Sequence, residues 1–469
     1  MNPSNITATQ FVQVNQKPSG TKSDYKQNPI YKNLNDLILN KKAHIGVIGL
    51  GYVGLPLSIA FADAGYSVTG FDNNAQKVDL LNEGKSYVQD VSTENVAKHV
   101  KAGKFLAVAQ FSALKDCHVI VVCVPTPLSK TKDPDVSYII AALSKIEMNF
   151  RSGQLVILES TTYPGTTREV LLPKLEEAGK AKEGRVFDCG KDFFLAFSPE
   201  RVDPGNQKFN VYNTPKVVGG ITDTCGDLAA VFYSQVMEKV VRVSSPEAAE
   251  MVKLLENTFR SVNIALVNEV AIMCEKLKIN CWEVIEAAAT KPFGFMPFYP
   301  GPGVGGHCIP LDPSYLSWKL RSLNYTARFI ELANAVNLSM PEFCVDKLAA
   351  ALNEDERAVK GSKILVIGVA YKKDIDDMRE SPALDIIHLL RDRGAKVDYY
   401  DPHVPELSWE GIELKSIKWT ENIGTSYDGV LIATDHSGVN YATLLKNSRR
   451  VVDTRNAMKA FKDDKITKI

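Results

Sequence analysis

Short apolar runs separated by amphipathic or polar stretches occupy most of this chain of 469 residues. The β-rich runs lie at 44–48, 66–71, 119–124, 155–158, 193–197 and 216–218. Continuous apolar runs of this length are typical of buried parallel strands. A helix is expected from about Leu55 to Ala64, between the first two runs. A second strand-helix-strand unit is expected further along the chain, at 363–370, 382–393 and 396–400. The pattern predicts an α/β protein with two Rossmann-like parallel-sheet domains.

The stretch between the two α/β units has helical periodicity instead. Ser245 is a capping residue, Pro246 suits the first helical turn, and apolar residues then recur at helical spacing to about Leu277. Such a helix is about 45 Å long, at 1.5 Å per residue. It is either a buried connection or a spine that also carries a subunit interface. Further helices are expected at about 281–289 and 325–351.

These patterns divide the chain into four segments. Residues 1–42 are rich in Asn, Gln, Lys, Ser and Thr, with helical periodicity only at 31–39, and we expect a mobile polar extension. The predicted domains are a first Rossmann-like domain at 43–240, a helical central domain at 241–355 and a second Rossmann-like domain at 356–469.

Composition narrows the possible functions. The 55 acidic and 55 basic residues balance, which argues against a general nucleic-acid or membrane-surface binder. The eight cysteines include no CxxC pair, and no HExxH occurs, so neither a disulfide framework nor a structural metal is expected. Neither a membrane span nor a signal peptide is apparent. We expect a protein of the reducing cytoplasm.

A glycine-rich loop follows the first predicted strand. Residues 49–54 place Gly49, Gly51 and Gly54 in a GxGxxG pattern that opens a helix, and Asp72 ends the next strand. This is the setting of a dinucleotide-binding fingerprint. Asp72 can accept hydrogen bonds from ribose hydroxyls and would repel a 2′-phosphate, which favours NAD over NADP. Lys77 leaves the alternative open.

Two further loops stand at predicted strand ends. Residues 124–127 include Thr126, and residues 159–166 include Thr161. Ligands of open α/β sheets bind at this edge, although each loop alone could be a proline-braced turn.

The remaining chemistry lies in the middle of the chain. Residues 301–312 hold Cys308 in a glycine-rich loop with Asp312 four residues later, as a reactive thiol requires; an inert buried thiol beside a tight turn is the alternative. On the long helix, Lys253, Asn257 and Arg260 share one face. They form either a solvated stripe or a row that faces an anionic ligand.

Together these motifs resemble the nucleotide-sugar 6-dehydrogenases, which oxidise UDP-glucose or UDP-N-acetylhexosamines to uronic acids. The resemblance runs from about residue 43 to 456 and includes Ser-Pro-Glu-Arg at 198–201 and the stretch 371–382. It implies a four-electron oxidation with NAD, through a thiohemiacetal and a thioester on the cysteine.

The resemblance also implies roles for individual residues. The catalytic set is Cys308 as nucleophile, Lys253 as oxyanion stabiliser or acid/base group with Asn257 as its partner, Asp312 and Thr161 at the hydrolytic water, and Glu200 as the candidate general base. The cofactor set is Gly49, Gly51, Val53, Gly54, Asp72, Lys77, Thr126, Thr161 and Arg379. The substrate set is Glu200, Arg201, Lys253, Asn257, Arg260, Gly305, Lys372 and Arg455, with Lys372 and Arg455 at the UDP. A homodimer or higher oligomer and a role in capsule or O-antigen polysaccharide synthesis are expected.

Departures within the family point to one branch. Leu311 and the Arg201-Val202 pair differ from the UDP-glucose enzymes and resemble the UDP-N-acetylhexosamine branch. Residues 291–296 lack the His and Arg of the UDP-ManNAc enzymes. UDP-GlcNAc is therefore favoured, with UDP-GalNAc next and UDP-ManNAc or UDP-glucose as alternatives. A hydroxyacid-type dehydrogenase, which oxidises once, and a non-catalytic nucleotide-binding scaffold are the competing functions.

Overall fold

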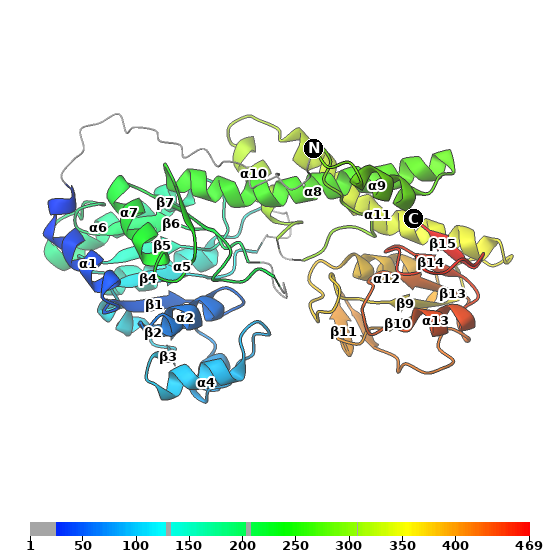
Figure 1. The fold of residues 1–469 in the computed structure, drawn as a ribbon, viewed down its shortest axis with the longest axis horizontal. Coiled ribbons are helices and arrows are strands. Elements are labelled where there is room, and N and C mark those ends of the chain that lie inside the picture. Colours follow the sequence, from blue (N-terminus) through cyan, green and yellow to red (C-terminus); the bar gives the residue numbers. More distant parts are fainter. Residues whose placement is uncertain (1–24, 128–132, 203–207, 307) are drawn as a thin grey trace, which may run out of the picture.

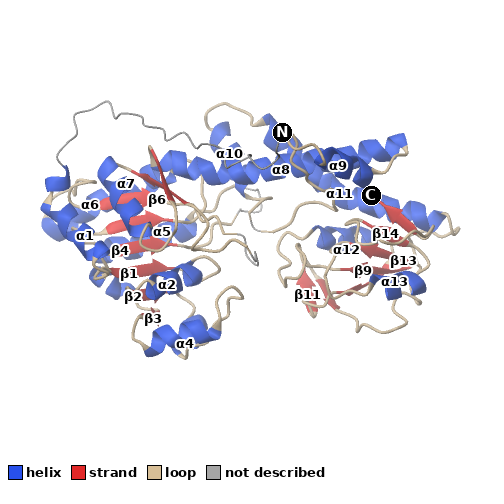
Figure 2. Cartoon of the chain, in the orientation of Figure 1, coloured by secondary structure: helices blue, strands red, loops and turns tan. Residues whose placement is uncertain are grey.

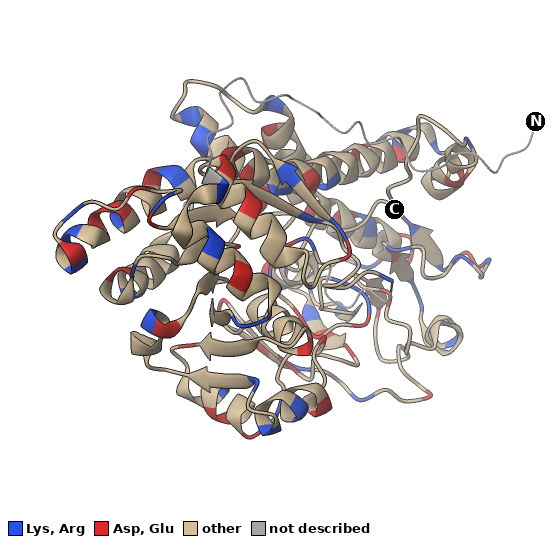
Figure 3. Ribbon diagram, turned by 60° about the vertical axis from the view of Figure 1, so that its left-hand side comes forward, with Lys and Arg blue, Asp and Glu red and all other residues tan. Residues whose placement is uncertain are grey.

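The computed structural model describes residues 25–127, 133–202, 208–306 and 308–469. Two α/β domains lie at opposite ends of one long helix, α8 (Pro246–Leu277), which crosses the top of Figure 1. The predicted α/β class, with two Rossmann-like domains joined by a helical middle, is confirmed. Figure 3 shows acidic and basic residues interspersed over the domains, as the balanced charge suggests.

The N-terminal domain is built on an eight-stranded sheet in the order β3-β2-β1-β4-β5-β6-β7-β8. The strands are β1 (His44–Ile48), β2 (Ser67–Phe71), β3 (Phe105–Val108), β4 (Val119–Val122), β5 (Leu155–Leu158), β6 (Phe194–Phe197), β7 (Lys216–Gly220) and β8 (Val240–Val243). The helices are α2 (Gly54–Asp63), α3 (Ala75–Asn82), α4 (Thr93–Lys101), α5 (Ser137–Asn149), α6 (Leu172–Glu183) and α7 (Asp223–Tyr233), with short turns of helix at η1 (Tyr25–Gln27), η2 (Phe111–Asp116) and η3 (Thr167–Leu171). All neighbours are parallel except β6 and β7, so the expectation of parallel pairing is wrong at that step. In the described parts of 198–215 no helix crosses the sheet, and the chain can return alongside β6 in the opposite direction.

Part of the expected polar extension belongs to this domain. Helix α1 (Pro29–Leu39) is capped by Asn28 and buries Tyr31, Leu34 and Ile38. The Tyr66 hydroxyl donates to the Ile38 carbonyl over 2.8 Å. The expectation of a mobile extension is therefore wrong for residues 29–39, because three apolar side chains on one face are enough to dock a polar helix. Residues 1–24 lie outside the described residues.

The middle of the chain is helical, as Figure 2 shows. Helix α8 begins at the Ser245 cap and is joined by α9 (Cys281–Ala289), α10 (Asp312–Arg321) and α11 (Arg328–Asn353). The Asn268 side chain of α8 donates to Asn337 of α11 over 2.9 Å and accepts from the Gly301 amide at 3.0 Å. One buried amide thus ties both α11 and the loop at 301–312 to the long helix.

The C-terminal domain has a parallel sheet in the order β10-β9-β13-β14-β15 and a separate hairpin, β11–β12. The strands are β9 (Lys363–Ile367), β10 (Lys396–Tyr400), β11 (Glu406–Trp409), β12 (Ile412–Lys415), β13 (Gly429–Ile432), β14 (Val451–Asp453) and β15 (Ile466–Lys468), and the helices are α12 (Pro382–Asp392) and α13 (Tyr441–Asn447). No helix of the described part of the chain is long and apolar enough to cross a membrane.

Candidate active site

A cavity of about 1260 Å³ joins all three parts of the molecule. Its walls come from the strand ends of the N-terminal domain, from α8 and the loop before α10, and from residues 378–384 of the C-terminal domain. Twelve residues of the predicted site line it: Gly49, Gly51, Val53, Asp72, Lys77, Thr126, Thr161, Glu200, Lys253, Cys308, Asp312 and Arg379. Residues far apart in the sequence are thus brought into one space.

The three glycines of the loop after β1 have different surroundings. Gly49 has a φ of +90°, and a Cβ there would lie 2.6 Å from the Cys123 carbonyl oxygen. A Cβ on Gly54 would lie 1.8 Å from the Gly49 oxygen, whereas one on Gly51 would meet no atom within 4 Å. Gly49 and Gly54 therefore allow the tight turn. Gly51 leaves open space beside the N-terminus of α2, where a pyrophosphate can accept from free N–H groups.

Asp72 is held at the edge of this loop. Its carboxylate accepts from the Leu50 amide at 3.0 Å and from the Asn74 amide at 2.9 Å. The Lys77 ammonium lies 5.4 Å from the centre of the Tyr87 ring. The acid is therefore fixed at the wall of the cavity, and the lysine is drawn onto an aromatic face beside it.

The glycines of the cysteine loop allow the C-terminal domain to approach. The Gly306 amide donates to the Arg379 carbonyl over 2.9 Å, and a Cβ on this residue would lie 2.8 Å from Tyr371 Cε2. A Cβ on Gly305 would lie 2.7 Å from the Glu380 oxygen. Gly305 therefore packs against the C-terminal domain rather than facing the cavity.

A buried polar cluster surrounds the thiol. The Asn257 side chain donates to Asp312 Oδ2 over 2.5 Å, and Lys253 is only 9% exposed. Burial raises the pKa of Asp312 to about 6, although Lys253 and Asn257 oppose the rise. Burial, and then the Asp312 charge, raise the pKa of Cys308 to about 11. The free thiol is therefore protonated at neutral pH.

Glu200 also lines the cavity. Its Oε1 accepts from the Arg201 and Val202 amides at 2.8 and 2.6 Å, and its Oε2 lies 3.4 Å from the Lys216 ammonium. Burial alone would raise the pKa of Glu200, but Lys216 and the two amides outweigh it and lower the pKa. Glu200 is thus an ionised carboxylate at the cavity wall.

The other predicted substrate residues have different surroundings. Arg201 pairs with Glu256 of α8 and donates to the Pro215 carbonyl over 2.6 Å, so it anchors the 198–202 loop. Arg260 is exposed on α8. Arg455 donates to the Ala433 carbonyl and lies against Gly301, where a Cβ would be 2.5 Å from its Nη1. As far as the structure is described, the lining of the cavity includes none of these three, nor Gly54, Asn257, Gly305 or Lys372.

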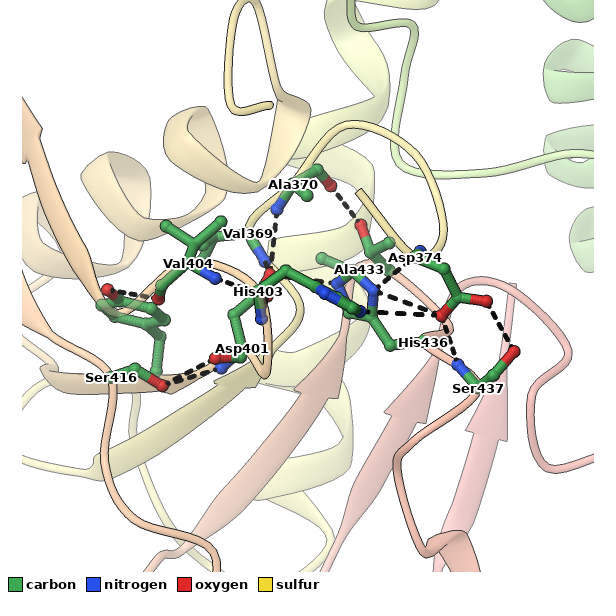
Figure 4. A network of polar contacts seen from close by, with 12 residues as sticks. Val369, Ala370, Asp374, Asp401, His403, Val404, Ser416, Ala433, His436 and Ser437 are labelled. Atoms are coloured by element: carbon green, nitrogen blue, oxygen red, sulfur yellow. Dashed lines mark hydrogen bonds and ion pairs between the residues drawn. The ribbon is translucent and has the colours of Figure 1, made fainter. Parts of the chain in front are cut away.

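The second Rossmann-like unit uses its strand-end acid differently. Figure 4 shows Asp401, after β10, accepting from the Val369, Ala370 and Val404 amides and paired with His436 at 3.0 Å. The Asp401 carboxylate is fully engaged in hydrogen bonds, whereas Asp72 faces an open cavity. The sequence pattern, strand followed by acid, is the same in both units, but the surroundings are not.

Three potential metal ligands also meet in Figure 4. Ligand atoms of Asp374, His403 and His436 lie within 4.8 Å of one another. The two ring nitrogens of His436 are already engaged, since Nδ1 accepts from the Asp374 amide and Nε2 bonds to Asp401. A metal would have to displace the amide, so we assign the trio a structural role.

Sequence reasoning missed several residues at the cavity. Lys216 and Tyr233 hold Glu159 at the end of β5, and the Tyr315 hydroxyl donates to the Thr126 carbonyl over 2.5 Å. Tyr52 lies under the Arg379 guanidinium, 5.7 Å from the ring centre. The only signal in the sequence is a charged residue at one end of an apolar strand: Glu159 directly after β5, and Lys216 at the start of β7.

Comparison with known proteins decides the family. Profiles of the UDP-glucose/GDP-mannose dehydrogenase family match in order: the NAD binding domain at 43–237, the central domain at 247–339 and the UDP binding domain at 365–460. The chain belongs to the UDP-glucose/GDP-mannose dehydrogenase family. The resemblance read from the motifs is confirmed, and so is NAD as the cofactor.

Relatives within the UDP-glucose/GDP-mannose dehydrogenase family carry different substrate names. A UDP-N-acetyl-D-mannosamine dehydrogenase of Pyrococcus horikoshii is 37% identical over 88% of this chain and 96% of its own. A UDP-N-acetyl-D-glucosamine 6-dehydrogenase of Pseudomonas aeruginosa is 34% identical over 85% of this chain and 91% of its own. The solved structure of the UDP-D-ManNAc dehydrogenase from Pyrococcus horikoshii has a TM-score of 0.81, with 34% identity over 91% of this chain and 99% of that one. The chain is therefore an oxidoreductase of this family, and its UDP binding domain indicates a UDP-sugar substrate.

Proposed function

We propose that this chain oxidises C6 of a UDP-N-acetylhexosamine, first of all UDP-GlcNAc, to the UDP-uronic acid. The observation that carries the proposal is the single cavity that holds Cys308, Lys253 and Asp312 beside the dinucleotide loop. A thiol at that place retains an aldehyde between two oxidations, which a simple alcohol dehydrogenase does not need. The named relatives at similar identity include both GlcNAc and ManNAc enzymes. The absence of His and Arg from 291–296 favours GlcNAc.

NAD would lie against the 49–54 loop, with its ribose at Asp72, and supplies hydride acceptance. Lys77, Val53, Thr126, Thr161 and Arg379 complete the proposed cofactor contacts. Over the reaction, one alcohol, two NAD⁺ and one water give one carboxylate, two NADH and three protons.

The residues of the chain handle the protons and the covalent bond. Lys253 stabilises the alkoxide that develops at C6. The sulfur of Cys308 adds to the aldehyde, and the resulting thiohemiacetal is oxidised to a thioester. Water held by Thr161 and Asp312 then attacks the thioester carbon, with Glu200 as the base, and the carbon–sulfur bond breaks.

We place the UDP at the C-terminal domain, near Lys372 and Arg455. Burial lowers the pKa of the Arg455 guanidinium, because a desolvated cation is disfavoured unless an anion is close. A diphosphate would offset that cost. We further propose at least a dimer, a location in the cytoplasm and a role in surface polysaccharide synthesis.

The test is a panel of UDP-GlcNAc, UDP-GalNAc, UDP-ManNAc and UDP-glucose, with NADH followed by absorbance and the acid by mass spectrometry. We expect two NADH per UDP-uronic acid, with UDP-GlcNAc the preferred substrate. One NADH per product would indicate the single-oxidation alternative.

A matched variant tests the role of the thiol. Cys308→Ser should release no acid and still bind NAD and the UDP-sugar, because oxygen at that position cannot form a thioester. Acid release by this variant at the wild-type rate would remove Cys308 from the mechanism.

A further inference from the structure

A buried ionic network lies at the wall of the cavity, which Glu159 and Glu200 line. The Lys216 ammonium lies 2.8 Å from Glu159 Oε2 and 3.4 Å from Glu200 Oε2. The side chains of Lys216, Glu159 and Glu200 are 6%, 0% and 17% exposed. The Tyr233 hydroxyl donates to the other oxygen of Glu159. One lysine thus bridges two carboxylates, of which only Glu200 has a part in the proposed reaction.

The backbone holds the network rigidly. Lys216 is the first residue of β7, and its amide donates to the Lys239 carbonyl over 2.9 Å. Glu159 directly follows β5, and its amide donates to the Val122 carbonyl, also over 2.9 Å. Glu200 follows β6 and is gripped at Oε1 by two amides, so that only Oε2 faces Lys216. The backbone therefore places the three charged side chains next to one another.

The charges around Glu200 come from several elements. Lys216 of β7 and Lys253 of α8 favour its ionised form. Glu159 is a second anion on the same lysine, and beside Glu159 lie Tyr233 of α7 and the Cys123 thiol after β4. Burial raises the pKa of Glu159, whereas that of Glu200 is lowered. Two carboxylates that share one cation compete for it.

We propose that Lys216 and Glu159 are positioning residues that set the charge of Glu200. Lys216 holds the Glu200 carboxylate ionised, and Glu159 keeps the contact with Lys216 when Glu200 accepts a proton. This inference rests on the proposed function. In the hydrolytic step one water proton moves to Glu200 and the water oxygen bonds to the thioester carbon. The carbon–sulfur bond breaks as the sulfur takes up the other water proton, which leaves a carboxylate and the Cys308 thiol. The neutral Glu200 then releases Lys216, which keeps its shorter contact to Glu159.

The two positioning residues should act in opposite directions on the pH profile. Lys216→Met removes the cation and leaves the Glu159 anion, so the pKa of Glu200 rises. The low-pH limb of the pH–rate profile for thioester hydrolysis then moves to higher pH. Glu159→Gln removes the competing anion, so Lys216 pairs more strongly with Glu200 and the limb moves to lower pH. We expect shifts of about one pH unit, or about tenfold in rate on the limb.

The experiment combines kinetics with a direct titration of Glu200. Single turnovers of the best UDP-N-acetylhexosamine are quenched from about pH 5 to 9, and the acyl-enzyme on Cys308 is followed by mass spectrometry. Infrared difference spectra against Glu200→Gln report the Glu200 carboxyl in each variant. The control is Lys347→Met, which breaks a partly buried ion pair with Glu275, 2.9 Å long and remote from the cavity.

Opposite shifts in Lys216→Met and Glu159→Gln, with the control at the wild-type position, support the proposal. Shifts in the same direction, or unchanged infrared titrations, overturn it. If Lys216→Met does not fold, Glu159→Gln alone must still lower the pKa of Glu200. If the wild type oxidises no UDP-N-acetylhexosamine, the proposed function fails, and the infrared titration still decides whether Lys216 and Glu159 set the charge of Glu200.

Discussion

The charge on Asp312 should lower the stability of the fold. This residue is 3% exposed, opens α10 and accepts from Asn257. We expect Asp312→Asn to stabilise the protein above pH 7 and to abolish acid formation, because the amide has no charge to bury. A gain in stability with a loss of activity would separate the two roles of this carboxylate.

The size of the expected stability change follows from the raised pKa of Asp312. Burial raises the pKa of Asp312 from 3.8 to about 6, so the folded state prefers the protonated acid. The associated stability is present below the unfolded pKa and is lost as pH rises through the folded one. With a difference of about two pKa units between the folded and unfolded states, ionisation of Asp312 lowers the free energy of unfolding by about 3 kcal/mol at pH 8 and by about 1.5 kcal/mol at pH 5. The advantage of Asp312→Asn should therefore grow by about 1.5 kcal/mol between pH 5 and pH 8.

Urea unfolding at both pH values measures this growth. The control is Asp223→Asn, which changes the first residue of α7, where the side chain is 71% exposed. The stability difference between Asp223→Asn and the wild type should be the same at pH 5 and at pH 8. If Asp312→Asn were equally or more destabilised at pH 8 than at pH 5, the buried charge would not cost stability and the reasoning would be refuted.

Three further outcomes can be measured directly. Asp72→Ala should narrow the preference for NAD over NADP, and equal use of both cofactors by the wild type would contradict the role of Asp72. Arg455→Ala should raise the KM for the UDP-sugar about tenfold and leave that for NAD nearly unchanged, whereas equal effects would place the UDP elsewhere. Light scattering should show at least a dimer, because Leu255, Phe259 and Leu266 of α8 are 58%, 47% and 54% exposed, and a monomer at micromolar concentration would rule this out.

The sequence predicted those parts of the fold that depend on local patterns. The long helix begins at the expected cap, Ser245, and the Gly49–Asp72 fingerprint occupies the expected strand, loop and helix. Local patterns could not show the antiparallel β6–β7 pair, because the direction of a strand depends on the path of its connection. The hairpin β11–β12 was also not predicted from the sequence.

Long-range pairing limited the prediction of the site. Arg201 stands in a motif that suggests substrate binding, yet it pairs with Glu256, which lies 55 residues further along the chain. Lys216 begins an apolar strand, a position where a lysine is ordinarily solvated, and its burial between Glu159 and Glu200 depends on the order of strands in the sheet. A motif identifies a residue type at a position, but not the charge that meets it across the fold.

The charges around Cys308 limit how its thiol can react. Its pKa is about 11, and that of Asp312, the nearby carboxylate, is about 6. Transfer of the thiol proton to Asp312 before the attack would therefore be uphill by several pKa units. The alkoxide that forms as sulfur adds to the aldehyde is a far stronger base than Asp312, and Lys253 can stabilise this alkoxide. Loss of the thiol proton and formation of the carbon–sulfur bond are therefore expected to occur together.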